Sequence, residues 1–219
     1  MDFFKSTTPE TRNSVMHFHE RMLKYSPNAP NSDFPEFCNI WRDAMDASWV
    51  WMWMYNDFSS QWELTAYDSN FDAEKWLDKT NLVWPDTTSV SEFVTQTEDP
   101  IFVNDLDHWH TLYKGTKFRV SCAKQLKQMG CTAFCTVPLI SPISGETSRD
   151  PFDPNLPIRA AICAHYKDVK SWKSFPKESL ILMGRLTGTL VRNSYNAEHR
   201  DILIHLNVTV HQNHCRRRV

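Results

Sequence analysis

The chain has 219 residues, a formal net charge of −2 at pH 7, 41% hydrophobic residues and 13% aromatic residues. This length fits one domain with extensions, and the near-neutral charge gives no support for a nucleic-acid-binding surface. The five glycines nearly exclude a glycine-rich phosphate loop, and the six cysteines form no C-x-x-C pair. No apolar run reaches the roughly 18 residues of a membrane span, and the N-terminus does not resemble a signal peptide. We therefore expect a reduced, cytoplasmic protein without a membrane segment.

The first third of the chain predicts two helices and a hairpin. Helical spacing over 10–25 is followed by a proline-rich break, and a second helix begins near Glu36, with Asp33 or Ser32 as its N-cap. The hairpin pairs the strand SWVWMWMY (48–55) with the strand WELTAYDS (62–69) through a polar turn.

The remaining chain alternates between short helices and strands. Residues 72–82 read as helical or irregular, and Ser89 and Glu92 have the spacing of a capping box for a short helix over 89–100. The later elements follow in chain order: a brief strand IFVND, a helix over 119–129 that ends at Gly130, a strand CTAFCTVPLIS, a proline-rich loop over 141–157, a strand IRAAICAHY, and a helix with Pro176 in its first turn. The tail over 201–213 fits either a helix or a strand.

The tryptophan-rich strand splits its side chains between the two faces of a sheet. Because side chains alternate along a strand, Trp49, Trp51, Trp53 and Tyr55 share one face, and the aliphatic and methionine side chains between them share the other. Methionine suits packing under helices, whereas a wall of indoles suits a flat ligand or a cation. We predict that the methionine face lies beneath the terminal helices and that the tryptophan face lines a cavity. The alternative is that both faces are ordinary core.

Four segments, taken in order, resemble the GAF family of small-molecule sensor domains. They are the hairpin ASWVWMWMYND with WELTAYDS, the segment SVSEFVTQTEDPIFVNDL, the strand GCTAFCTVPLI, and the final strand and helix RAAICAHYKDVKSWKSFPKESLILMGRLTGTL. Together they cover about residues 35–195. The chain departs from the family pattern where Arg159 and two alanines replace the glycine that usually opens the last strand, and in the length of the 141–157 loop.

The resemblance implies an α+β fold with a central antiparallel sheet of five or six strands. It places the terminal helices on one face and a ligand pocket on the other. The domain boundaries expected from it are an N-terminal helical extension over 1–34, a GAF-like domain over 35–195, and a C-terminal extension over 196–219, a helical linker or docking tail. It also implies a homodimer formed through the terminal helices, with a signal passing along the last helix.

Candidate ligand-binding residues come from three places in this framework. Trp51 and Trp53 lie on the tryptophan face. The segment NDLDHWHTLYKGTKFR supplies polar groups of the kind that give a pocket specificity, namely Asp105, His108, Trp109, Tyr113 and Arg119. Thr136, Cys163 and His165 come from the two later strands. Asp105 could instead cap its own loop, and Cys163 could be a small buried hydrophobe.

These features favour a non-catalytic regulatory domain that binds an unidentified small molecule. Two alternatives remain: a thiol-dependent enzyme on the same fold, similar to free methionine sulfoxide reductases, and an interaction or dimerisation scaffold whose pocket is filled by its own side chains. Cys122 lacks the adjacent histidine of bilin-attachment sites, and the residues typical of cyclic-nucleotide GAF domains are missing. No metal site or catalytic residue is predicted, and partners are expected to be a small molecule, a second copy and an output domain or partner protein.

Overall fold

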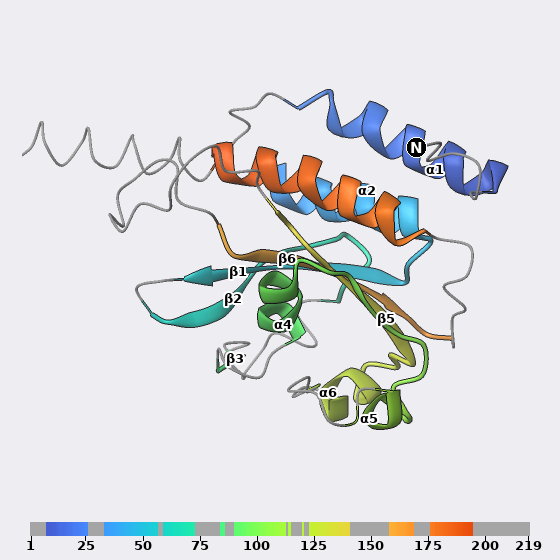
Figure 1. Ribbon diagram of the computed structural model, residues 1–219, viewed down its shortest axis with the longest axis vertical. Coiled ribbons are helices and arrows are strands. Elements are labelled where there is room, and N and C mark those ends of the chain that lie inside the picture. Colours follow the sequence, from blue (N-terminus) through green and yellow to red (C-terminus); the bar gives the residue numbers. More distant parts are fainter. Residues whose placement is uncertain are drawn as a thin grey trace, which may run out of the picture.

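The computed structural model describes residues 8–25, 33–56, 59–72, 84–85, 90–112, 114, 120, 123–140, 158–168 and 176–194. At its centre is a six-stranded antiparallel sheet in the order β3-β2-β1-β6-β5-β4 (Figure 1). The strands are β1 Trp49–Asn56, β2 Gln61–Tyr67, β3 Trp84–Pro85, β4 Ile101–Val103, β5 Ala133–Pro138 and β6 Ala160–Tyr166. The predicted α+β fold with a central antiparallel sheet of five or six strands is confirmed.

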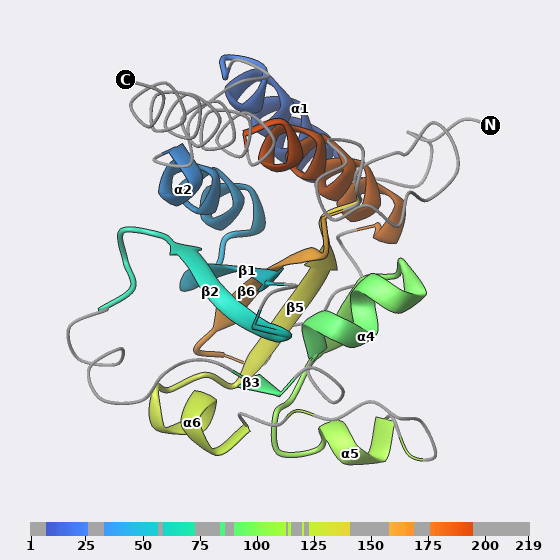
Figure 2. The same cartoon turned by 90° about the vertical axis from the view of Figure 1, so that its left-hand side faces the viewer.

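Helices cover both faces of this sheet. On one face lie α1 (Pro9–Met22), α2 (Phe34–Met45) and the helix over 177–194 (Figures 1 and 2). On the other side lie the shorter helices α4 (Val90–Thr97), α5 (Trp109–Leu112) and α6 (Ala123–Gln128). Asp33 is the N-cap residue of α2, as predicted, but its side chain makes no capping hydrogen bond.

The alternating side chains of β1 separate two hydrophobic clusters. Val50 and Met52 are fully buried in the cluster that contains α1, α2 and the helix over 177–194. Trp49, Trp51 and Trp53 belong to a second cluster on the opposite face. The predicted assignment of the methionine face to the terminal helices is therefore confirmed. We call the opposite face, formed around these three residues, the tryptophan face.

The terminal helices fit closely onto the sheet and onto one another. Trp41 of α2 donates from Nε1 to Oγ1 of Thr187 at 2.9 Å, which joins α2 to the helix over 177–194. At Gly184 an added Cβ would lie 2.5 Å from the backbone oxygen of Pro138, and at Gly188 it would lie 2.8 Å from the backbone of Leu139. Only glycine allows the helix to approach the end of β5 this closely.

The helices and strands differ from the predicted set in a few places. β3, which pairs with β2 through Trp84 and Pro85, and the short helix α5 were not predicted. α1 lies in the predicted N-terminal extension over 1–34, and its residues Val15, Phe18 and Met22 share a core cluster with α2. The loop over 141–157 and the tail over 201–213 lie outside the described residues.

Candidate functional site

The tryptophan face collects several predicted site residues from three adjacent strands. In the strand register, Trp49 pairs with His165 and Trp51 pairs with Cys163. β5 lies on the other side of β6, where Phe134 pairs with His165 and Thr136 pairs with Cys163. The predicted residues brought together here are Trp51, Trp53, Thr136, Cys163 and His165. Sequence reasoning put Trp49 on this face but not among the site residues.

Aromatic rings on this face are in direct contact. The rings of Trp49 and His165 are stacked, with their centroids 5.3 Å apart and their planes 6° from parallel. The ring of Trp51 lies 4.4 Å from His165 at 56° and meets Phe71 edge to face at 5.2 Å. Phe134 adds a tilted ring 6.2 Å from His165. The exposed fractions of Trp49, Trp51 and His165 are only 5%, 2% and 2%, so the cluster is closed in this conformation.

Three nitrogen atoms of this ring cluster are buried without a hydrogen-bond partner. They are Nε1 of Trp49, Nε1 of Trp51 and Nδ1 of His165. Two other buried tryptophans in the chain do find partners: Trp41 donates to Thr187, and Trp62 donates from Nε1 to Glu92 at 3.2 Å. Buried polar atoms are nearly always paired in folded proteins, so a group of three unpaired ones calls for an explanation.

His165 is a neutral imidazole in this setting. Burial lowers its pKa from the ordinary 6.5 to about 3, although the backbone of Trp49 and Cys163 acts in the opposite direction. Because the ring is uncharged, it offers one N–H donor and one acceptor nitrogen, whose positions depend on the tautomer. It brings no positive charge to the face.

The thiols on or near the tryptophan face are protonated. Oγ1 of Thr136 lies 3.3 Å from Sγ of Cys163, and burial raises the pKa of Cys163 to about 11. Burial also raises the pKa of Cys131 to about 12. A thiol needs its thiolate form to act as a nucleophile, and these pKa values disfavour that form at neutral pH. Cys122 lies outside the described residues.

A charged cluster that the sequence did not reveal closes the Trp53 end of this face. The Glu92 carboxylate of α4 accepts hydrogen bonds from Trp62 at 3.2 Å and from Gln96 at 2.5 Å, and it lies 3.5 Å from Nη1 of Arg159. The Arg159 guanidinium stands 3.2 Å above the ring of Tyr55. Trp62 and Tyr55 were visible as aromatic residues of the hairpin, but nothing in the sequence spacing connected them to Glu92. The cluster ties α4 to β1, to β2 and to Arg159, the residue just before β6.

The predicted polar segment after β4 forms local contacts. The Asp105 carboxylate accepts from the backbone N–H of Asp107 and from Nδ1 of His108, both at 2.8 Å. These bonds, that from His108 first, hold the pKa of Asp105 below its usual range. Asp105 thus acts as a cap for its own loop, while Trp109 is partly buried and packs against the tryptophan-face cluster. The predicted residues Tyr113 and Arg119 lie outside the described part.

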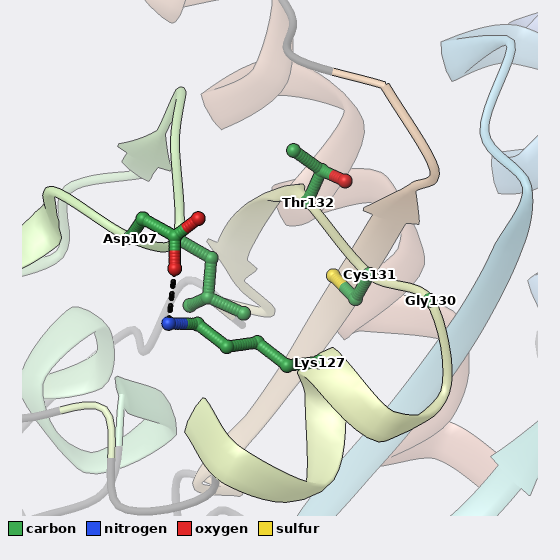
Figure 3. Close-up of a pocket in the computed structure, with 6 residues that line it drawn as sticks. Asp107, Lys127, Gly130, Cys131 and Thr132 are labelled. Carbon is green, nitrogen blue, oxygen red and sulfur yellow. Dashed lines mark hydrogen bonds and ion pairs between the residues drawn. The ribbon is translucent and has the colours of Figure 1, made fainter.

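A separate cavity of about 280 Å³ lies beside α6 (Figure 3). It is lined by Leu106, Asp107, Lys127, Gly130, Cys131 and Thr132. Asp107 and Lys127 form an ion pair across it, and Sγ of Cys131 donates to the backbone oxygen of Ala133 at 3.3 Å. The polar groups of this cavity are thus largely paired with one another, and none of the predicted site residues lines it.

Two kinds of feature are missing from the part of the chain that the structure describes. No group of three or more histidine, cysteine, aspartate or glutamate side chains there could hold a metal ion. Among the described helices, none is both long and apolar enough to cross a membrane.

Comparison with known proteins finds similarity in structure only. No family model and no curated protein matches the sequence. The solved GAF domain of an Acinetobacter phosphoenolpyruvate-protein phosphotransferase matches with a TM-score of 0.51 and 10% identity, over 90% of this chain and 97% of that domain. Free methionine-R-sulfoxide reductase from Neisseria meningitidis, solved with its substrate, matches with a TM-score of 0.55 and 10% identity, over 89% and 96% of the two chains.

A third similar structure is a far-red-absorbing protein in its dark state with bound biliverdin. It matches with a TM-score of 0.56 and 11% identity, over 83% of this chain and 99% of that chain. At these identities the matches establish the fold, which is that of GAF domains.

Proposed function

We propose that this GAF-like chain is a non-catalytic regulatory domain that binds a small molecule at the tryptophan face. Binding would be passed through the terminal helices to an output domain or a partner protein. The observation that carries the proposal is the group of three unpaired buried nitrogens, on Trp49, Trp51 and His165, beside the hydrophobic cluster of the tryptophan face. A few polar groups set into an apolar and aromatic wall are typical of small-molecule sites.

The closed conformation is costly at this point of the fold. Each buried polar group left without a partner costs about 1–3 kcal/mol. A ligand that supplies the missing partners recovers this free energy, but it must first displace side chains that now bury Trp49 and Trp51. Ligand binding therefore favours a second conformation of the side chains that bury Trp49 and Trp51. A ligand shifts a protein between two states only when its affinity for the two states differs.

β1 gives a physical route from the tryptophan face to the helices. Its odd-numbered residues Trp49 and Trp51 line the face, while Val50 and Met52 between them pack against the helical layer. A displacement of β1 must therefore disturb both layers, because buried interiors are packed without spare volume. Gly184 and Gly188 hold the helix over 177–194 against the end of β5, so this helix follows movements of the sheet.

The terminal helices also carry the surface that we propose for homodimer formation. The exposed large hydrophobic residues of the described part all belong to α1, its C-cap or the helix over 177–194: Met16 is 57% exposed, Leu23 71% and Leu182 44%. Exposed apolar side chains on these helices favour association with a second copy.

One observation favours a second candidate function, an interaction scaffold with a filled pocket. The three tryptophans of β1 are at most 5% exposed, so side chains of the chain itself fill the tryptophan face in this conformation. A scaffold would keep this arrangement permanently and would bind no small molecule.

Native mass spectrometry of the freshly purified full chain distinguishes the two functions. We expect a non-covalent small mass that leaves the protein on activation and is reduced in Trp51→Phe. Trp41→Phe is the matched control, because Trp41 lies on the helical face and its indole is already paired with Thr187. A spectrum with the protein mass alone, or an equal loss of the small mass in both variants, contradicts the sensor and supports the scaffold.

A further inference from the structure

We infer that the ligand of the tryptophan face is an uncharged, flat molecule whose edge carries hydrogen-bond acceptors, such as carbonyl oxygens or pyridine-type nitrogens. This inference rests on the proposed function and names the class of ligand for the same face. It follows from three properties of the ring cluster: the direction of its hydrogen bonds, the shape of its walls and its charge.

The unpaired groups call for acceptors. An indole nitrogen is a donor only, so Nε1 of Trp49 and Nε1 of Trp51 can be satisfied only by acceptor atoms. Nδ1 of His165 accepts or donates according to its tautomer. A ligand rich in donors, such as an ammonium ion, would leave both indoles unpaired. Contacts of an N–H with a neighbouring aromatic ring are weaker than a hydrogen bond to oxygen and do not remove this demand.

The walls of the cluster favour a planar molecule. Trp49 and His165 lie 6° from parallel, and Phe134 is tilted by 37° from His165. Trp49 and Trp51 are two residues apart on one strand, so their backbones are about 6.6 Å apart. Both indoles are in contact with His165, and one flat molecule of two fused rings is therefore large enough to reach them.

The charge of the site argues against an anion. Among the described residues, Arg159 is a cation on this face, and it is engaged with Glu92 and Tyr55 at the Trp53 end. An ionised group brought into this apolar layer without a cationic partner would lose its hydration with little return. A neutral acceptor avoids this cost and still pairs with the indoles.

A pair of probes that differ in a single carbonyl group tests the inference. The full chain is labelled with nitrogen-15 at its indole groups and titrated with 1-indanone and, separately, with indane, which has the same fused rings without the oxygen. Trp49→Phe and Trp51→Phe assign the two indole N–H signals. The indole of Trp41, bonded to Thr187 on the opposite face, is the internal control.

We expect 1-indanone to move the Trp49 and Trp51 N–H signals downfield and to bind roughly 2- to 13-fold more tightly than indane, the range that one hydrogen bond supplies. The double variant Trp49→Phe/Trp51→Phe removes this difference between the probes, while the Trp41 signal stays in place.

Two results overturn the inference, and they separate it from the proposed function. Equal binding of both probes at these signals contradicts the requirement for acceptors but leaves a face that binds small molecules. If neither probe moves the signals of Trp49, Trp51 and Trp53, the face does not admit small molecules, and the proposed function fails together with the inference.

Discussion

Replacing His165 by phenylalanine should remove most of the acid sensitivity that this residue gives to the fold. His165 is buried against Trp49 and Trp51, and its pKa falls from 6.5 to about 3 on folding. The folded state therefore binds this proton less well than the unfolded state. The stability that depends on the neutral ring is complete above pH 6.5 and is lost progressively as the pH falls towards 3.

The size of the effect follows from these two pKa values. Between pH 7.5 and pH 5, protonation of His165 in the unfolded state alone lowers the free energy of unfolding by about 2 kcal/mol. His165→Phe should not show this decrease in the free energy of unfolding between pH 7.5 and pH 5, because phenylalanine does not titrate. At pH 7.5 it should be at least as stable as the wild type, because it removes a buried nitrogen that has no partner.

Urea unfolding of both proteins at pH 7.5 and pH 5 measures the difference. The comparison subtracts the change in the free energy of unfolding of the variant from the change in the wild type. The subtraction is needed because burial raises the pKa of Asp68 to about 6, so Asp68 stabilises both proteins as the pH falls from 7.5 to 5. His17→Phe, at a side chain that is 68% exposed, is the matched control. Its free energy of unfolding should fall between pH 7.5 and pH 5 by as much as that of the wild type. Equal losses in His165→Phe and the wild type would refute the account of a buried, neutral His165.

The other predictions concern the remaining parts of the fold. Asp68→Asn should raise the free energy of unfolding at pH 7.5 by about 1–2 kcal/mol, allowing for solvent screening, because the raised pKa of Asp68 makes its charged form unfavourable in the folded state. This gain in stability should vanish by pH 4. A lower free energy of unfolding in the variant at pH 7.5 would contradict the prediction. Asp43→Asn should lower the free energy of unfolding at pH 7.5 in the urea assay. Burial raises the pKa of Asp43, but its hydrogen bonds to Arg21 and Arg42 outweigh burial and lower it, so the charged carboxylate is stabilised in the folded state. Gly188→Ala should destabilise by about 1–3 kcal/mol in the same assay, because its Cβ would overlap the chain after β5; an unchanged midpoint would refute this contact. Cys163 should resist alkylation in the native protein and react after unfolding, and rapid native labelling, identified by mass spectrometry, would restore the thiol-enzyme hypothesis.

Most helices and strands could be predicted from the sequence because local patterns and tertiary packing agree, whereas the central sheet and its helical cover were inferred from the resemblance to GAF domains. The alternation in SWVWMWMY divided the side chains of β1 between two faces, and the suitability of methionine for packing under helices indicated which face meets them. The two-residue strand β3 was missed because it carries no periodic pattern and forms only through its pairing with β2. The helix α5 has four residues, which is too short for helical spacing to be recognised.

The candidate site could be predicted only in part. Trp51, Cys163 and His165 meet because alternation and the order of the strands bring them to one face. The unpaired state of Nε1 of Trp49 depends on the orientation of the ring among its neighbours, which no sequence spacing encodes. The contact between Glu92 and Arg159 joins residues 67 positions apart and likewise required the folded chain.

The most direct test of ligand binding at the tryptophan face compares two preparations of the same indole-labelled protein. One is purified without denaturation, and the other is unfolded, washed and refolded in clean buffer. We predict that the N–H signals of Trp49 and Trp51 differ between the preparations and that the small-molecule extract of the first restores them in the second. The Trp41 signal should be identical in both, which shows that refolding is complete. Identical Trp49 and Trp51 signals in both preparations, unaffected by the extract, would contradict a bound small molecule at this face.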